Sequence, residues 1–165
     1  QPPGQAEAIL EKDVRRSLEV FFCRGWYWDV QNLRRFPRDS AERTMDLLRM
    51  IEEGRFLGQR FMTEDEITYY TKTFEVTGFT GGLNYYRASA QDGFPNAVDD
   101  IRVPCLYVGA ENDTILRPSS ADRMPAFIPD LERHVVGDCG HWTQQEKPAE
   151  FNRVALDWLN RKFVV

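Results

Sequence analysis

Two side chains capable of acid–base chemistry follow two predicted strands. His141 lies in a glycine-rich loop, residues 137–142, directly after a strand predicted for residues 132–136. Asp113 closes the short loop after a second predicted strand, residues 105–108. The ordinary pKa of histidine lies near neutrality, which suits a general base, and a neighbouring carboxylate orients the ring and stabilises the imidazolium. The pair predicts two members of a nucleophile–base–acid triad, with an Asp113 carboxylate oxygen within hydrogen-bond reach of a His141 ring nitrogen.

Strands and helices alternate around this pair. The predicted order from residue 99 onward is strand, helix, strand and helix, over residues 105–108, about 119–127, 132–136 and about 148–163. Such a βαβα order predicts parallel strands packed by helices, and functional side chains of these sheets gather beyond the carboxyl ends of the strands. Asp113 and His141 both occupy that edge. The C-terminal part, residues 99–165, is therefore predicted to be α/β.

The first part of the chain, residues 1–98, carries helical patterns without intervening strands. Apolar residues recur at helical spacing in several segments. Helices are predicted over residues 5–22, 40–53, 63–77 and 83–90. Thr63 opens the third helix with the pattern of a capping box, Gly54 and Gly78 end two helices, and the Gly81-Gly82 pair predicts a turn. This part is therefore predicted to be an all-helical subdomain.

The composition argues against several classes of function. Of the 165 residues 42% are hydrophobic and 28% are charged, and the formal net charge is −5. An acidic chain speaks against a nucleic-acid or anionic-membrane partner, because phosphate binding needs a basic surface. No apolar run is long enough to span a bilayer, and no secretory signal is visible. The three widely spaced cysteines contain no CxxC pair, which argues against a disulfide framework or a metal site and favours a cytoplasmic protein.

Two longer motifs carry a resemblance to a known family. Residues 101–113, together with Gly140-His141-Trp142, resemble the C-terminal end of α/β-hydrolases. The run Gly78-Phe-Thr-Gly-Gly-Leu-Asn-Tyr-Tyr-Arg87 looks like a cap motif of the soluble epoxide hydrolases, and residues 140–148 are also similar to that group. The resemblance covers nearly the whole chain. It implies a fragment of the α/β-hydrolase fold, in which a helical cap, or lid, is followed by the C-terminal βαβα part of a parallel sheet.

The resemblance also implies roles for individual residues. His141 matches the base that activates water to cleave a covalent aspartyl ester, and Asp113 matches the acid that orients the imidazole. Tyr86 matches a cap tyrosine that donates a hydrogen bond to the epoxide oxygen and should face the pocket above His141. Trp142 is expected to line the substrate pocket, with core packing as the alternative. The implied reaction converts an epoxide and water to a vicinal diol without a cofactor or a metal.

Other parts of the implied machinery belong to segments that would precede residue 1. They are the nucleophilic aspartate, the oxyanion hole and a second cap tyrosine, and Gln1-Pro-Pro-Gly4 resembles the residues just after that tyrosine. We therefore interpret the sequence as the C-terminal piece of a longer enzyme, which by itself should lack hydrolase activity. Its implied partners are the N-terminal half of the same protein, a small epoxide and water, with a homodimer as a further option.

Alternatives stay open for the function and for single residues. One alternative function is a haloalkane or haloacid dehalogenase of the same fold, against which the motif of Tyr86 speaks. Another is a noncatalytic binding protein, against which the intact acid–base pair speaks. Glu111 and Asp122 compete with Asp113 as the acid of the triad. His134 is interpreted as a histidine within its strand whose ring is hydrogen-bonded or lies at the surface. Core packing is expected of Tyr69, Tyr70 and Tyr85.

Overall fold

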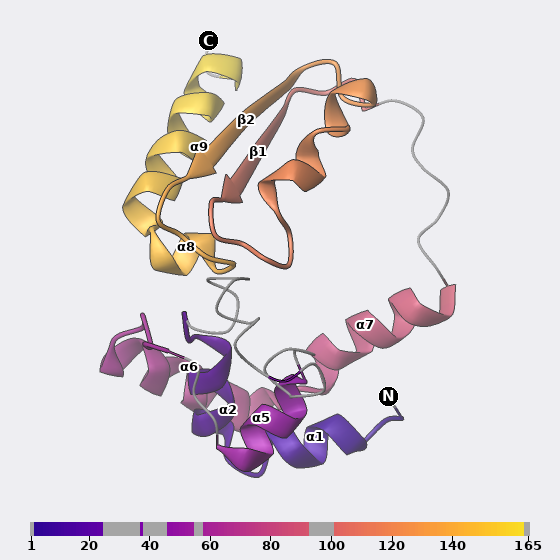
Figure 1. The fold of residues 1–165 in the computed structure, drawn as a ribbon, viewed down its shortest axis with the longest axis vertical. Coiled ribbons are helices and arrows are strands. Elements are labelled where there is room, and N and C mark those ends of the chain that lie inside the picture. The colour runs from indigo at the N-terminus through magenta and orange to yellow at the C-terminus, as the bar shows by residue number, and fades with distance from the viewer. Residues whose placement is uncertain (1, 25–36, 38–45, 55–57, 93–100, 164–165) are drawn as a thin grey trace. The chain divides into compact units, whose positions relative to one another are not determined.

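The computed structural model describes residues 2–24, 37, 46–54, 58–92 and 101–163 of the chain (Figure 1). These residues fall into two compact units, the first ending at residue 92 and the second beginning at residue 101. The subdomain boundary expected at residue 98 lies outside the described residues. None of the helices in the described part is long and apolar enough to cross a membrane.

The first unit is helical. Its elements are α1 (Gln5–Leu10), α2 (Val14–Phe21), α5 (Leu47–Glu53), α6 (Glu64–Thr77) and α7 (Thr80–Asp92). α2 packs against α5 and α6, and α1 packs against α5 (Figure 1). Four of these helices contribute a side chain that is at most 2% exposed, namely Leu10, Leu18, Met50 and Ile67. Burial of these apolar side chains is the main force that holds the helices together.

Two predictions for the helical unit are wrong in detail. The single helix predicted over residues 5–22 is interrupted, because the Asp13 carboxylate accepts a hydrogen bond from the Arg16 backbone N–H at 3.0 Å and so begins α2 as a new helix. The turn predicted at Gly81-Gly82 is absent, since both glycines lie in the first turn of α7. The helix end predicted at Gly54 is confirmed, with a left-handed φ of 67°. Residues 40–45 of the second predicted helix lie outside the described residues.

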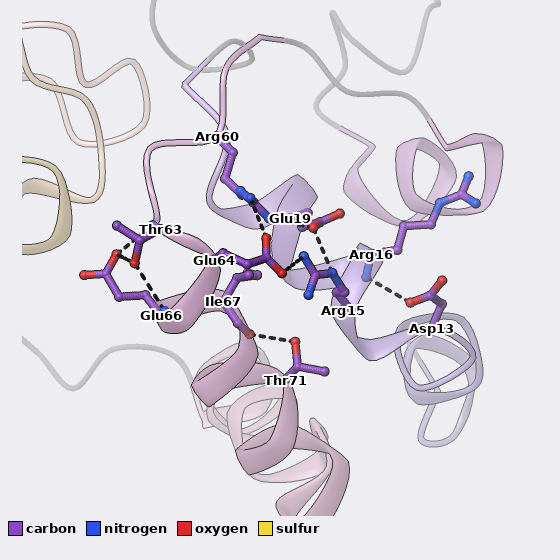
Figure 2. Close-up of polar contacts among 10 residues, drawn as sticks. All are labelled: Asp13, Arg15, Arg16, Glu19, Arg60, Thr63, Glu64, Glu66, Ile67 and Thr71. Carbon is purple, nitrogen blue, oxygen red and sulfur yellow. Dashed lines mark hydrogen bonds and ion pairs between the residues drawn. The ribbon is translucent and has the colours of Figure 1, made fainter.

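The capping box predicted at Thr63 is confirmed and opens α6 (Figure 2). The Thr63 backbone N–H donates to Glu66 Oε2 at 2.7 Å, and the Glu66 backbone N–H donates to Thr63 Oγ1 at 3.3 Å. Each side chain thereby satisfies a backbone donor that has no partner within the helix. The hydrogen bonds from the Thr63 backbone and hydroxyl lower the pKa of the Glu66 carboxyl. α6 ends at Thr77, directly before Gly78, as predicted.

Four charged side chains join α2 to the start of α6 (Figure 2). Arg15 contacts Glu19 at 3.1 Å and Glu64 at 2.6 Å. Arg60 contacts the same two carboxylates, at 2.8 and 3.0 Å. Hydrogen bonds from both arginines lower the pKa of Glu64. Because water and salt screen such partly exposed ion pairs, the network orients the two helices more than it stabilises them.

A further ion pair ties α1 to α7. Arg87 donates from Nη1 to Glu7 Oε1 at 2.7 Å and from Nη2 to Glu7 Oε2 at 2.9 Å. Glu7 also accepts the Gly4 backbone N–H at 2.9 Å. These hydrogen bonds, that of Arg87 first, lower the pKa of Glu7 from 4.5 to about 2. This bidentate ion pair joins residues Asn84–Arg87 of α7 to α1.

The stability of the full-length protein is expected to depend on Glu7 at acid pH. The pKa of Glu7 is lower in the folded than in the unfolded protein, so its stabilisation is complete above about pH 4.5 and is lost as the pH falls towards about 2. Urea unfolding should show that Glu7→Gln is less stable than the wild type at neutral pH, and that the difference shrinks between these two pH values. A difference that stays constant down to the lower pH would contradict the ion pair.

The second unit contains a parallel pair of strands. Its elements are β1 (Cys105–Ala110), η1 (Pro118–Ala121), η2 (Met124–Ala126), β2 (Leu131–Val136), α8 (Thr143–Glu146) and α9 (Pro148–Phe163). The strands run parallel, as predicted, from Cys105 opposite Leu131 to Ala110 opposite Val136. α9 packs along both strands (Figure 1). Both strands therefore end at the same edge of the sheet.

The α-helix predicted between the strands, at about residues 119–127, is wrong. The connection forms two short 3₁₀-helices, η1 and η2. Pro118 and Pro125 lie in their first turns. A proline has no backbone N–H to donate and crowds the carbonyl of the preceding turn, so Pro125 prevents one continuous α-helix across this segment. The helix α8 is an additional element that the apolar pattern does not predict.

Candidate active site

Asp113 stands beyond the carboxyl end of β1, in a turn that fixes its side chain. Its backbone N–H donates to the Ala110 carbonyl at 3.2 Å. Its Oδ1 accepts hydrogen bonds from the backbone N–H groups of Ile115 at 2.8 Å and Leu116 at 2.9 Å. The residue is only 7% exposed. A buried carboxylate needs such donors in place of the water it has lost, and here they also set the direction of Oδ2.

His141 lies beyond the carboxyl end of β2 and meets the second oxygen of Asp113. His141 Nδ1 is 3.0 Å from Asp113 Oδ2, so the predicted contact between the two residues is confirmed. Because a carboxylate only accepts hydrogen bonds, Nδ1 carries a proton and donates a hydrogen bond to Asp113 Oδ2. In the neutral ring the nitrogen that accepts a proton is then Nε2. The contact therefore selects the tautomer that a general base requires.

The two loops that carry these residues are joined through their backbones. The Glu111 N–H donates to the Val136 carbonyl at 3.0 Å, and the Asn112 N–H donates to the Cys139 carbonyl at 2.9 Å. Ala110, Val136 and Cys139 form a buried apolar cluster beneath the loops. The distance between the acid and the histidine is thus set by the parallel register of β1 and β2.

The competing residues have other partners. Glu111 Oε2 accepts the backbone N–H of Asp138 at 2.9 Å. Asp122 accepts a hydrogen bond from Arg133 Nη2 at 2.8 Å. His134 Nε2 lies 3.1 Å from Glu150 Oε1 on α9, in agreement with its interpretation as a satisfied histidine of the strand. These contacts leave Asp113 as the candidate acid that the structure places against His141.

Tyr107 places a phenol on β1, the strand that precedes Asp113. A methyl group at Gly109 would come 2.6 Å from the Tyr107 hydroxyl, so the glycine makes room for the tyrosine ring along its own strand. The Arg133 guanidinium lies 6.0 Å from the centre of that ring. Burial raises the pKa of the Tyr107 hydroxyl, and the negative charge of Asp113 adds to this effect. Tyr107 is therefore a neutral phenol at physiological pH.

Glu146 is a candidate site residue that the family motif does not single out. Its carboxylate accepts hydrogen bonds from the backbone N–H groups of Gly140 at 3.1 Å and Trp142 at 3.3 Å. These two residues flank His141. The threonine of Thr143-Gln-Gln-Glu146 precedes the glutamate by three positions, a spacing typical of a carboxylate that folds back onto the backbone at a helix start. The spacing indicates a carboxylate on the backbone at a helix start, but it does not predict that Glu146 binds the amides on both sides of His141.

The tyrosines of α6 and α7 differ in exposure. Tyr86 is 74% exposed on α7, beside Tyr85 at 70%, and Tyr69 of α6 is also 70% exposed. The expected core packing is therefore wrong for Tyr69 and Tyr85, whose positions lie off the buried stripe of their helices. Tyr70 does contact the first unit's core, with its ring centre 5.2 Å from that of Phe22. The exposed position of Tyr86 keeps its ring out of the helical core.

The second unit thus presents a histidine, a carboxylate that contacts its ring and an apolar ring at one edge. Trp142 is half-buried and meets the His141 ring edge to face, with the ring centres 5.4 Å apart. A histidine held in this way can take a proton from water and so drive hydrolysis of a bound ester. Within the described residues, no group of histidine, cysteine or acidic side chains is arranged to hold a metal ion.

Comparisons with known sequences show similarity to epoxide hydrolases of the α/β-hydrolase fold. The chain matches the α/β hydrolase fold family over residues 1–148. It is similar to bifunctional epoxide hydrolase 2 of Sus scrofa, with 36% identity over 96% of this chain and 28% of that protein. It is also similar to epoxide hydrolase A of Mycobacterium tuberculosis, with 35% identity over 96% of this chain and 50% of that protein. The chain therefore spans half or less of the length of these relatives.

Solved structures of epoxide hydrolases are also similar to this chain. The structure is similar to epoxide hydrolase A from Mycobacterium thermoresistibile, with a TM-score of 0.74 and 26% identity over 97% of this chain and 50% of that one. The fold is also similar to that of epoxide hydrolase I from potato, with a TM-score of 0.64 and 23% identity over 98% of this chain and 51% of that one. The helices and parallel strands thus correspond to part of an α/β-hydrolase fold.

Proposed function

This chain belongs to the epoxide hydrolases of the α/β-hydrolase fold, and we propose that it supplies the acid, the base and one hydrogen-bond donor of an enzyme that converts epoxides to vicinal diols. The observation that carries the proposal is the 3.0 Å contact between His141 Nδ1 and Asp113 Oδ2. The nucleophile in this proposal is an aspartate in a part of the protein outside these 165 residues. The chain alone is then inactive as a hydrolase.

The proposed reaction has two halves. The aspartate carboxylate attacks an epoxide carbon, the carbon–oxygen bond of the ring breaks, and the ring oxygen takes up a proton as it becomes a hydroxyl. In the second half, His141 Nε2 takes a proton from water, and the water oxygen attacks the carbonyl of the ester. Asp113 stabilises the imidazolium that this step creates. Collapse of the tetrahedral intermediate releases the diol, whose leaving oxygen receives the proton held by His141. The aspartic acid that remains returns a proton to solvent, which supplied the proton that the ring oxygen took up in the first half.

Tyr86 and Trp142 complete the proposed substrate site. A tyrosine hydroxyl is a neutral donor at physiological pH, so Tyr86 can stabilise the negative charge that develops on the epoxide oxygen. Because Tyr86 is 74% exposed, its ring does not pack in the core of the helical unit. Trp142, next to the base, offers an apolar face to the organic part of the substrate.

We further propose that the helical unit is the cap and that the second unit is the C-terminal part of the catalytic core. The second unit exposes several large apolar side chains, each 42–63% exposed: Val103, Leu116, Val135, Leu156, Leu159 and Phe163. A pair of strands is marginal in water without further packing. The partner that we propose for this apolar surface is the N-terminal half of the same protein, which would extend the sheet and cover α9.

The remaining parts of the proposal are the small partners and the location. The substrates are a small epoxide and water, and the reaction needs no cofactor. All three cysteines are thiols rather than disulfides, in keeping with a cytoplasmic location. Assembly as a homodimer stays a prediction.

Product analysis of the full-length protein tests the proposed function. Incubation with styrene oxide should give the vicinal diol, and incubation with bromobutane should release no bromide. Bromide release without diol formation would favour a dehalogenase instead. Formation of neither product would favour a noncatalytic binding protein and would overturn the proposal.

The Tyr86→Phe variant tests the donor in the cap. The change keeps the ring and removes the hydroxyl at an exposed position, so folding should be unaffected. A donor aimed at a developing oxyanion is typically worth about 3 kcal/mol, so the rate of ester formation should fall by roughly a hundredfold. The loss is smaller where a second tyrosine also donates a hydrogen bond to the oxyanion. Stopped-flow measurement of ester formation gives this rate. Tyr85→Phe is the matched control on the same helix, and equal rates in both variants would exclude Tyr86 as the donor.

A further inference from the structure

We infer that Glu146 is the positioning residue that holds the backbone of His141, an inference that rests on the proposed role of His141 as the base. Glu146 Oε2 accepts the Gly140 N–H at 3.1 Å, and Glu146 Oε1 accepts the Trp142 N–H at 3.3 Å. One carboxylate therefore spans the histidine. One of its oxygens binds the amide of the preceding residue, and the other binds the amide of the following residue.

The loop needs such a restraint because a glycine directly precedes the histidine. Glycine has no Cβ and adopts more backbone conformations than any other residue, so a free Gly140 would let His141 change direction. Gly140 is held through both of its polar groups. Its N–H donates to Glu146, and its carbonyl accepts a hydrogen bond from the hydroxyl of the buried Thr143 at 3.4 Å.

The short helix α8 places the Glu146 carboxylate. The Glu146 backbone N–H donates to the Trp142 carbonyl at 2.8 Å, while its side chain accepts the Trp142 N–H. The Lys147 N–H donates to the Thr143 carbonyl at 3.0 Å, which closes the same turn. These backbone contacts do not depend on the carboxylate. A substitution that removes only the carboxylate should therefore leave α8 in place and release the loop.

Asp113 and Glu146 restrain different parts of His141. Asp113 fixes the ring through Nδ1, whereas Glu146 fixes the main chain on both sides of the residue. A general base has to hold its proton-accepting nitrogen within hydrogen-bond distance of the attacking water. The loss of Glu146 should consequently slow hydrolysis of the ester, the step in which His141 acts. Formation of the ester, which uses no base, should not change.

Single-turnover kinetics of the full-length enzyme with styrene oxide separates these two steps. Glu146→Ala removes both acceptors, and Glu146→Gln retains one. We expect hydrolysis of the ester to slow roughly a hundredfold in Glu146→Ala, the order of loss that a misplacement of about 1 Å produces, and less in Glu146→Gln. Glu150→Gln is the matched control, because it removes a nearby carboxylate whose contact is with His134, and it should hydrolyse the ester at the wild-type rate.

The measurement distinguishes positioning from a general loss of structure. Partial unfolding lowers the amount of ester formed but changes neither rate constant, and Glu146→Gln decides the question if the alanine variant does not fold. Hydrolysis at the wild-type rate in both variants, or an equal loss in both steps, would overturn the inference about Glu146 and leave the proposed function standing. Absence of any ester in the wild type would overturn the proposed function itself, and the role of Glu146 with it.

Discussion

The His141→Gln variant of the full-length enzyme is expected to stop after the first half of the reaction and to accumulate a covalent ester. The proposed aspartate nucleophile is charged at neutral pH and needs no base, so attack on the epoxide continues. Glutamine cannot take the proton of the attacking water, so the ester persists. General acid–base catalysis typically contributes about 10²–10⁴-fold, and hydrolysis of the ester should slow by that order. Intact-mass spectrometry should show protein heavier by the full mass of the epoxide, because ring opening has no leaving group.

The other histidine provides the matched control for this experiment. His134 is half-buried on β2 and contacts Glu150, so His134→Gln changes the same side chain in the same unit at a position with no proposed role. It should turn over the epoxide like the wild type. Normal turnover of His141→Gln would remove His141 from the mechanism. Loss of its turnover without an adduct would contradict the ester intermediate.

The acid–base pair was predictable because its geometry follows from strand order. Each residue comes a few positions after an apolar run, and parallel strands end at the same edge of a sheet. The register of Ala110 opposite Val136 then brings Asp113 and His141 together. The capping box at Thr63 was predictable for a similar reason, since all of its partners lie within one turn of the chain.

Other features depend on side-chain hydrogen bonds, on a proline and on helix packing, none of which the spacing of apolar residues shows. Apolar residues at helical spacing continue through Asp13, but the carboxylate of that residue bonds the backbone and begins a new helix. Pro125 divides the segment between the strands, although the residues around it favour a helix. The exposure of Tyr85 depends on which side of α7 meets its neighbours. Glu146 escapes prediction because its role arises from a loop that folds back over the helix start.

The Asp113→Asn variant of the full-length enzyme is expected to lose turnover by about 10⁴-fold, as when the aspartate of a serine-protease triad is replaced by asparagine. The amide oxygen of asparagine can still accept the N–H groups of Ile115 and Leu116, which directs its NH₂ group towards His141. A donor facing Nδ1 favours the tautomer that carries its proton on Nε2. In that tautomer Nε2 cannot take a proton from water. The loss should therefore fall on hydrolysis of the ester, whereas ester formation continues.

Nitrogen NMR of the histidine ring tests this reason directly, because it reports which ring nitrogen carries the proton. The wild type should be protonated on Nδ1 of His141, and Asp113→Asn on Nε2. Asp122→Asn is the matched control, since Asp122 pairs with Arg133 and competes with Asp113 only in the sequence, and it should keep the wild-type rate. A severe loss in Asp122→Asn with little loss in Asp113→Asn would transfer the role of the acid. Loss of ester formation together with hydrolysis in Asp113→Asn would show instead that the Asp113 turn supports the site as a whole, because a change of tautomer alone acts only on the step that uses His141.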